Sequence, residues 1–149
     1  MDRFAEALLS RQANPALPAE DDWFAPLLGD WEFDYQDRGG RRLKGEWYFR
    51  RALDGMAIED LFICPSRDTR EENPQPDGEY GAATYICSKG TTRLEARKEG
   101  GVIACTVLED PSNQWRFVKV TEDTFHWQNV TKQAEGLQVN CEVFARRIR

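Results

Sequence analysis

Apolar and polar residues alternate along most of the chain from Trp31 onward. Trp31, Phe33 and Tyr35 are separated by single acidic residues, a period of two that is typical of a strand with one buried face. Similar patterning recurs in eight further segments, which are residues 43–51, 56–64, 80–88, 91–97, 102–108, 115–120, 125–131 and 137–147. Short turn-forming runs separate nearly all of them, so the pattern predicts about nine antiparallel strands.

Two segments depart from this period. Residues 1–28 begin with apolar positions at helical spacing, and Pro15 and Pro18 end any helix there, so we expect a short N-terminal helix followed by a second short turn. Residues 65–78 contain three prolines and many charges without a hydrophobic period, which predicts a long exposed loop. We expect a single domain over residues 1–149, with a helical segment at 1–28 and the β-structure at 29–149.

Strand number and short connections also predict the architecture. An open meander leaves unpaired edges, and closing the sheet on itself removes them. We therefore expect a mainly β fold, an antiparallel up-and-down β-barrel of about nine strands with a short N-terminal helix. A two-sheet sandwich is the alternative, because turn spacing does not distinguish the two architectures.

Charge and cysteine usage narrow the function classes. Lys and Arg number 20 against 26 Asp and Glu, a net charge of −6, which opposes binding to nucleic acid or to an anionic membrane. The opening segment is acidic where a secretory signal would be basic. Cys64, Cys87, Cys105 and Cys141 lie singly in apolar segments without a CxxC pair. We expect four free thiols, a cytoplasmic location, no metal and no other cofactor.

The two ends of the expected barrel carry a family resemblance. Gly29-Asp30-Trp31 opens the first long strand, and Arg146 and Arg147 end the last one. A Gly-x-Trp with a late Arg resembles the calycin superfamily of lipocalins and fatty-acid-binding proteins. Runs such as LLGDWEFDY and CEVFARR are similar to those of small bacterial lipocalin-like domains. The resemblance implies a lipocalin-like barrel whose closed end is formed by Gly29, Trp31 and either Arg146 or Arg147, with the Arg packed on the indole.

The barrel interior is the candidate binding site. A barrel of this size holds packed side chains or one small ligand, and aromatic walls with a few polar groups are typical of small-molecule pockets. The residues that we expect to bind the ligand are Tyr35, Trp47, Phe49, Glu59, Leu61, Trp115, Trp127, Asn129 and Cys141. Glu59 and Asn129 would orient its polar end. The sequence thus favours non-enzymatic binding of a small hydrophobic or amphipathic ligand.

Two other functions stay open. In an enzyme for a small hydrophobic substrate, Glu59 would act as general acid or base; Glu59 and Asp60 are adjacent in a strand and point to opposite faces, so they do not form a catalytic pair. If side chains fill the interior, the domain is instead a ligand-free, self-associating scaffold. The sequence leaves open whether the protein forms a homodimer. His126 lies between two aromatic residues that should face inward, so we expect it to face outward, away from any haem in the barrel.

Overall fold

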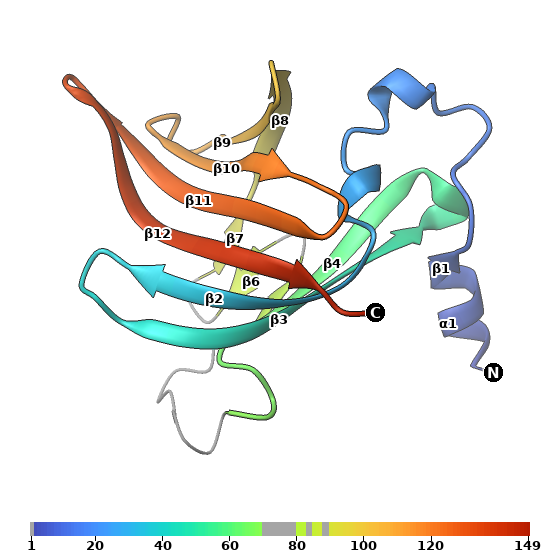
Figure 1. The fold of residues 1–149 in the computed structure, drawn as a ribbon. Coiled ribbons are helices and arrows are strands. Elements are labelled where there is room, and N and C mark those ends of the chain that lie inside the picture. The colour runs from blue at the N-terminus through green and yellow to red at the C-terminus, as the bar shows by residue number, and fades with distance from the viewer. Residues whose placement is uncertain (1, 70–79, 83–84, 88–89) are drawn as a thin grey trace.

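One strongly curved antiparallel sheet forms most of the molecule (Figure 1). The computed structural model describes residues 2–69, 80–82, 85–87 and 90–149. The nine main strands are β2 (Gly29–Asp37), β3 (Arg42–Ala52), β4 (Ala57–Ile63), β5 (Tyr80–Ala82), β8 (Leu94–Glu99), β9 (Val102–Val107), β10 (Asn113–Val120), β11 (Thr124–Gln133) and β12 (Gly136–Arg147). They follow the order β5-β4-β3-β2-β12-β11-β10-β9-β8. The mainly β, up-and-down antiparallel fold predicted from the alternation is confirmed.

The N-terminal segment adds short elements at one end of the sheet. The remaining elements there are α1 (Arg3–Leu8), β1 (Leu9–Ser10), η1 (Ala19–Asp21) and η2 (Ala25–Leu27), while η3 (Leu53–Gly55) joins β3 to β4. The Asp2 carboxylate caps α1 by accepting a hydrogen bond from the Phe4 backbone N–H at 3.0 Å. The short N-terminal helix is thus confirmed. No helix in the described parts of the chain has the length and apolar character needed to cross a membrane.

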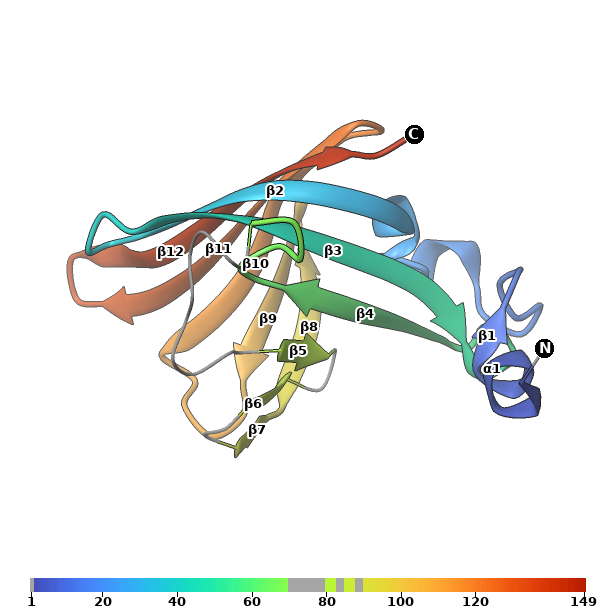
Figure 2. The same cartoon turned by 90° about the horizontal axis from the view of Figure 1, so that it is seen from below.

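The sheet curls as a barrel does, but its edges do not pair with each other in the part of the chain that the structure describes. β5 and β8 are the two edge strands. The expected strand at 80–88 is divided into β5 and β6 (Tyr85–Cys87), and the one at 91–97 into β7 (Gly90–Thr92) and β8, because Arg93 lies outside the strand conformation. β6 and β7 pair as a separate two-stranded sheet, which lies between the two edges in Figure 2.

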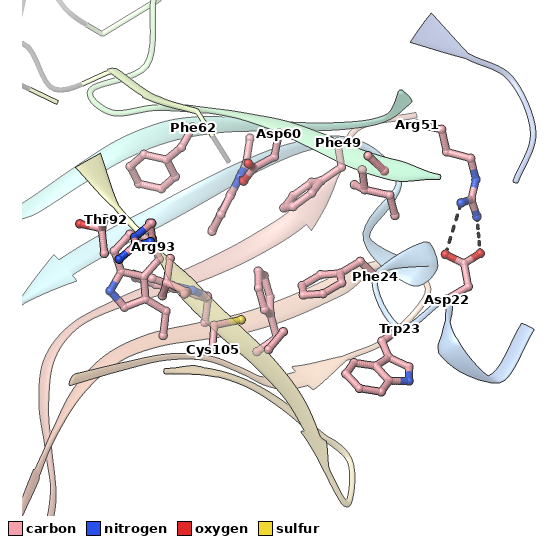
Figure 3. A pocket seen from close by; sticks show the side chains of 18 of the residues that line it. Asp22, Trp23, Phe24, Phe49, Arg51, Asp60, Phe62, Thr92, Arg93 and Cys105 are labelled. Carbon is pink, nitrogen blue, oxygen red and sulfur yellow. Dashed lines mark hydrogen bonds and ion pairs between the residues drawn. The ribbon is translucent and has the colours of Figure 1, made fainter. Parts of the chain in front are cut away.

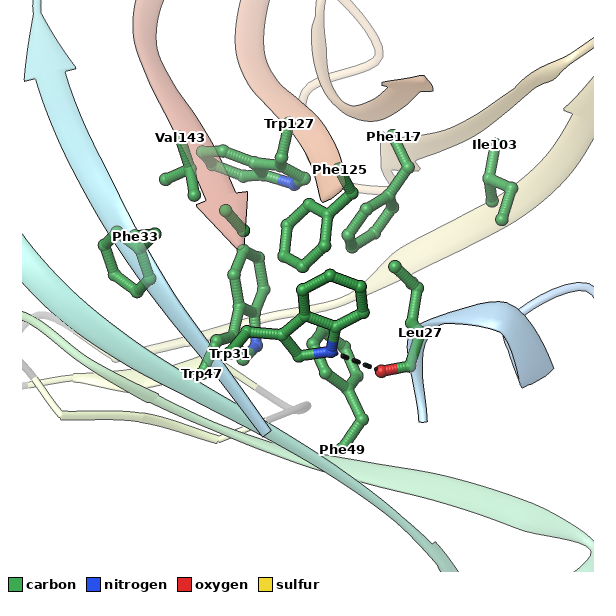
Figure 4. Packing of buried hydrophobic residues seen from close by; sticks show 11 residues of the cluster. Leu27, Trp31, Phe33, Trp47, Phe49, Ile103, Phe117, Phe125, Trp127 and Val143 are labelled. Atoms are coloured by element: carbon green, nitrogen blue, oxygen red, sulfur yellow. Dashed lines mark hydrogen bonds between the residues drawn. The ribbon is translucent and has the colours of Figure 1, made fainter. Parts of the chain in front are cut away.

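The concave face of the sheet carries an aromatic core (Figure 4). In β2, Trp31 and Phe33 point inward while Glu32 between them faces outward, as the alternation predicted. Trp47 of β3 lies at the centre of the core, and its ring contacts those of Phe33 at 6.1 Å and Phe125 at 5.5 Å between centroids. Burial of such large rings is the main source of stability for the sheet.

The predicted contact of a late arginine with Trp31 is present, and Arg147 is the arginine that packs on the indole. Trp31 is fully buried, and its indole N–H donates to the Leu27 carbonyl at 2.7 Å. The Arg147 guanidinium carbon lies 4.1 Å from the centre of the Trp31 ring. The same guanidinium donates to three backbone carbonyls, those of Pro26, Leu28 and Glu122. The hydrogen bonds to Pro26 and Leu28 therefore hold η2 against this end of the sheet.

Gly29 and Arg146 occupy different places at this end. Gly29 has a φ of +127°, and a Cβ there would lie 2.5 Å from an Arg147 guanidinium nitrogen, so the close approach of Arg147 requires glycine. Arg146 points to the opposite face, because neighbouring strand residues alternate, and it pairs there with Asp34 at 2.9 Å and with Glu32 at 3.5 Å.

A second glycine makes room for the core. Gly45 of β3 pairs across the sheet with Phe33, and a Cβ on Gly45 would lie 2.0 Å from the Phe33 ring. We expect Gly45→Ala to lower the free energy of unfolding by about 1–3 kcal/mol, because the buried ring must shift. Urea unfolding measures this loss, with Gly101→Ala as the control, since a Cβ there meets nothing within 4 Å. Equal stability of the two variants would contradict this packing.

Candidate ligand-binding site

A cavity of about 770 Å³ lies inside the curve of the sheet, which is within the usual range for small-molecule sites. β3 and β4 form one wall, β8 to β11 form the other, and residues of the N-terminal segment close one end. Figure 3 shows Phe49, Asp60 and Phe62 on one wall and Cys105 across from them. Side chains therefore do not fill the whole interior, and the space that remains is large enough for a small ligand.

Seven of the nine predicted binding residues line this cavity. They are Tyr35, Trp47, Phe49, Trp115, Trp127, Asn129 and Cys141. Each lies on the inward face of its strand, where the period of two places it. The alternation in β2, β3, β10, β11 and β12 was therefore sufficient to assign the inward face.

Glu59 and Leu61 were wrongly assigned to the interior. In the register of β3 and β4, Glu59 lies opposite Arg50 and Leu61 opposite Tyr48, on the outer face, and Leu61 is 56% exposed. The residues between them point inward, so Asp60 lies in the cavity. The hypothesis of an enzyme with Glu59 as its general acid or base inside the barrel is therefore wrong.

The η3 turn explains this exchange of faces. Leu53 and Asp54 both have positive φ, and the turn sets Ala52 opposite Ala57. Because side chains alternate along a strand, Glu59 and Leu61 lie on the same outer face of β4 as Ala57. Both faces of β4 carry a mixture of apolar and polar residues, so polarity alone does not indicate which face is buried. Phe62 lies opposite Trp47, and this aromatic pair was the feature of the sequence that would have given the correct face.

Asp60 is the buried acid of the cavity. One carboxylate oxygen, Oδ2, accepts a hydrogen bond from the Trp47 indole N–H at 2.5 Å. The other, Oδ1, is buried and has no hydrogen-bond partner among the described residues. Burial raises the pKa of Asp60 to about 6, against the lowering effect of the Trp47 hydrogen bond. Asp60 is thus ionised at neutral pH at an energetic cost that a ligand can reduce.

Aromatic rings surround this acid. Trp47 stacks on Phe49 at 5.2 Å and meets Phe62 edge to face at 4.9 Å. Trp127 contacts Trp47 at 5.9 Å and Trp115 at 6.0 Å. These rings provide flat apolar surfaces against which planar or aliphatic groups pack well.

The thiols and the phenol of the cavity are neutral polar groups. Burial raises the pKa of Cys105 to about 11, with a further rise from the nearby Asp60 charge. Burial also raises the pKa of the Cys141 thiol, and it raises that of the Tyr35 hydroxyl to about 12. A thiolate is the reactive form of cysteine. At neutral pH these thiols are therefore protonated and provide weak hydrogen-bonding and packing groups in the cavity wall.

The N-terminal segment contributes to the cavity in a way that the strand pattern does not show. Trp23 and Phe24 line it, and Phe24 meets Phe117 edge to face at 6.0 Å. Asp22 forms a two-point ion pair with Arg51 of β3, with N–O distances of 2.5 and 3.3 Å. Both of these side chains are largely buried. The aromatic pair at the start of the expected second turn was the signal for the contact of Phe24 with Phe117.

His126 lies on the outer face, as predicted. Its Nε2 is 2.9 Å from Glu142 Oε1, and its ring stacks on Phe144 at 4.5 Å. It is absent from the cavity wall. A haem in the cavity would therefore have no histidine ligand, because this is the chain's single histidine.

Three of the four cysteines, Cys64, Cys105 and Cys141, form no disulfide bond, and the side chain of Cys87 lies outside the described residues. We expect iodoacetamide to modify all four in denaturant without reductant. In the folded protein Cys105 should react more slowly than in denaturant, because its pKa is raised and it is partly buried. Mass spectrometry of the alkylated peptides checks both results. A disulfide-linked peptide would contradict the predicted cytoplasmic location.

Comparisons with known proteins add distant likenesses of fold. No protein-family model matches the chain, and no curated protein sequence matches it. One redesigned β-barrel is 13% identical over 84% of this chain and 94% of its own, with a TM-score of 0.45. A second, mFAP1, bound to DFHBI, is 16% identical over 82% of this chain and 95% of its own, with a TM-score of 0.42. The fold assignment therefore rests on the strand order itself.

Proposed function

We propose that the chain is a lipocalin-like domain that binds a small, partly apolar ligand non-covalently inside the curved sheet. The observation that carries this proposal is the cavity of about 770 Å³, which has aromatic walls and contains a buried carboxylate, that of Asp60, with no ion pair among the described residues. Small-molecule sites combine these features, since apolar walls supply affinity and a few polar groups fix the orientation of the ligand. No catalytic step is included in the proposal.

The closed end supports the lipocalin-like part of the proposal. The resemblance implied a Trp near the closed end of the barrel with a late Arg packed on it, and Trp31 and Arg147 have this arrangement. Arg147 also fastens the backbone of residues 26 to 28 across the sheet. These contacts hold η2 against the curved sheet at this end of the cavity, so we expect the site to be largely formed before a ligand enters.

Filling the cavity tests the binding proposal. 1-Aminonaphthalene is an uncharged bicyclic probe whose emission shifts to the blue in apolar surroundings. We expect it to bind the protein with this shift, and we expect Ala96→Trp to weaken its binding about tenfold or more, because Ala96 lines the cavity and an indole there would occupy it.

Glu95→Trp is the matched control for this experiment. It adds the same side chain to the same strand at an exposed position that does not line the cavity. The probe should bind this variant as it binds the native protein. Equal binding by both variants, or no binding to the native protein, would contradict a ligand site in the cavity.

A further inference from the structure

We propose that the ligand of this cavity is a small aromatic cation that donates an N–H hydrogen bond to Asp60, an inference that rests on the proposed function. Oδ1 of Asp60 is buried without a hydrogen-bond partner among the described residues, while Oδ2 is held by the Trp47 indole at 2.5 Å. Leaving a buried carboxylate oxygen unpaired is costly. A donor on the ligand would satisfy this oxygen.

The charges around the cavity favour a positive ligand. The cationic side chains that line it, Arg51 and Arg93, already pair with Asp22 at 2.5 Å and with Glu109 at 2.8 Å. Within the described residues, Asp60 forms no ion pair of its own. A cation that enters the cavity would therefore meet an uncompensated negative charge in surroundings of low dielectric, where such an attraction is strong.

The rings beside Asp60 favour a flat cation. Phe49 lies directly opposite Asp60 in the register of β3 and β4, and Phe62 follows it on the same face of β4. Figure 3 shows the two phenyl rings on either side of the carboxylate. The faces of aromatic rings attract cations, and planar ligands pack closely on them. Asp60 would thus bind the positive charge of the ligand, and the two phenyl rings would pack against its planar ring system.

A pair of probes of equal shape separates charge from apolar packing. 4-Aminoquinoline is protonated at neutral pH, and 1-aminonaphthalene has the same two-ring shape without the charge. By titration calorimetry at pH 8, we expect the native protein to bind the quinoline about tenfold or more tightly than the naphthalene, the factor expected of a charge-assisted hydrogen bond. In Asp60→Asn this preference should disappear, while the affinity for the naphthalene is retained.

Glu59→Gln is the matched control, because it removes one negative charge at the adjacent position on the outer face. It should keep the preference for the cation. A second measurement uses the native protein alone: the preference should fall as Asp60 becomes protonated between pH 7 and pH 5, while the quinoline keeps its charge.

The outcomes separate the two proposals. Equal binding of both probes by the native protein, or a preference that survives in Asp60→Asn, would overturn the assignment of a cation to Asp60 and leave the cavity as a binding site. A preference that Glu59→Gln also abolishes would show a general effect of negative charge and would likewise overturn it. If neither probe binds, the proposed function itself fails.

Discussion

Replacing Trp31 by Ala is expected to lower the free energy of unfolding by about 3–5 kcal/mol, the usual cost of removing a large buried aromatic side chain. The indole is fully buried, it contacts the Phe125 ring at 4.7 Å between centroids, and it supports the Arg147 guanidinium. For a domain of this size such a loss lowers the Tm by about 10 °C or more. Thermal unfolding followed by circular dichroism measures it.

Two variants show which part of this contact matters. Trp31→Phe keeps most of the buried area but loses the hydrogen bond to the Leu27 carbonyl, so we expect roughly half of the loss. Trp23→Ala removes a partly buried indole from the cavity wall and should cost less than Trp31→Ala. If Trp31→Ala unfolded at the native temperature, the closed end would not stabilise the sheet as described.

Replacing Asp60 by Asn is expected to have the opposite effect at pH 8 and to stabilise the protein by about 1–3 kcal/mol. A folded pKa of about 6, against the usual value of 3.8 for Asp, means that the folded state binds the proton more tightly than the unfolded chain. The carboxyl therefore contributes most stability below pH 4, and this contribution is lost as the pH rises through 6. Asn does not ionise and avoids the loss.

The difference in stability between Asp60→Asn and the native protein isolates this group. Other acids act in the opposite sense: ion pairing with Lys44 lowers the pKa of Asp34, and pairing with Arg67 lowers that of Glu46. Their effects cancel in the difference because both proteins contain them. Urea unfolding at several pH values should show the advantage of Asn at pH 8 shrinking toward zero near pH 4. A difference independent of pH would contradict the burial of an ionised Asp60.

The fold was predictable to the extent that one face of each strand is apolar. β2 and β3 have clear alternation, and there the sequence assigned Tyr35, Trp47 and Phe49 correctly to the inside. The division at Arg93 was not predictable, because residues 91–97 keep an unbroken alternation through the point where the strand ends. The lack of pairing between the two sheet edges within the described residues is likewise a long-range property that local patterns do not contain.

The candidate site was predictable in its walls but not in its polar group. The acid in the cavity is Asp60, one residue from the predicted Glu59, because a shift of one position in a strand exchanges its two faces. The positive φ of Leu53 and Asp54 sets the register of β4, and a Leu in that conformation is not expected from its sequence. Similarly, the contact of Phe24 with Phe117 joins segments that are far apart in the chain.

The five tryptophans allow binding in the cavity to be observed residue by residue. Each indole N–H gives a separate signal in a two-dimensional ¹H–¹⁵N NMR spectrum, assigned by single Trp→Phe variants. When 4-aminoquinoline is added, the signals of Trp47, Trp115 and Trp127, which line the cavity, should shift together and saturate. The Trp31 signal should not shift, because Trp31 lies outside the cavity wall and its indole N–H is hydrogen-bonded to the Leu27 carbonyl. Unchanged signals from Trp47, Trp115 and Trp127 in the presence of excess probe would contradict ligand binding inside the sheet.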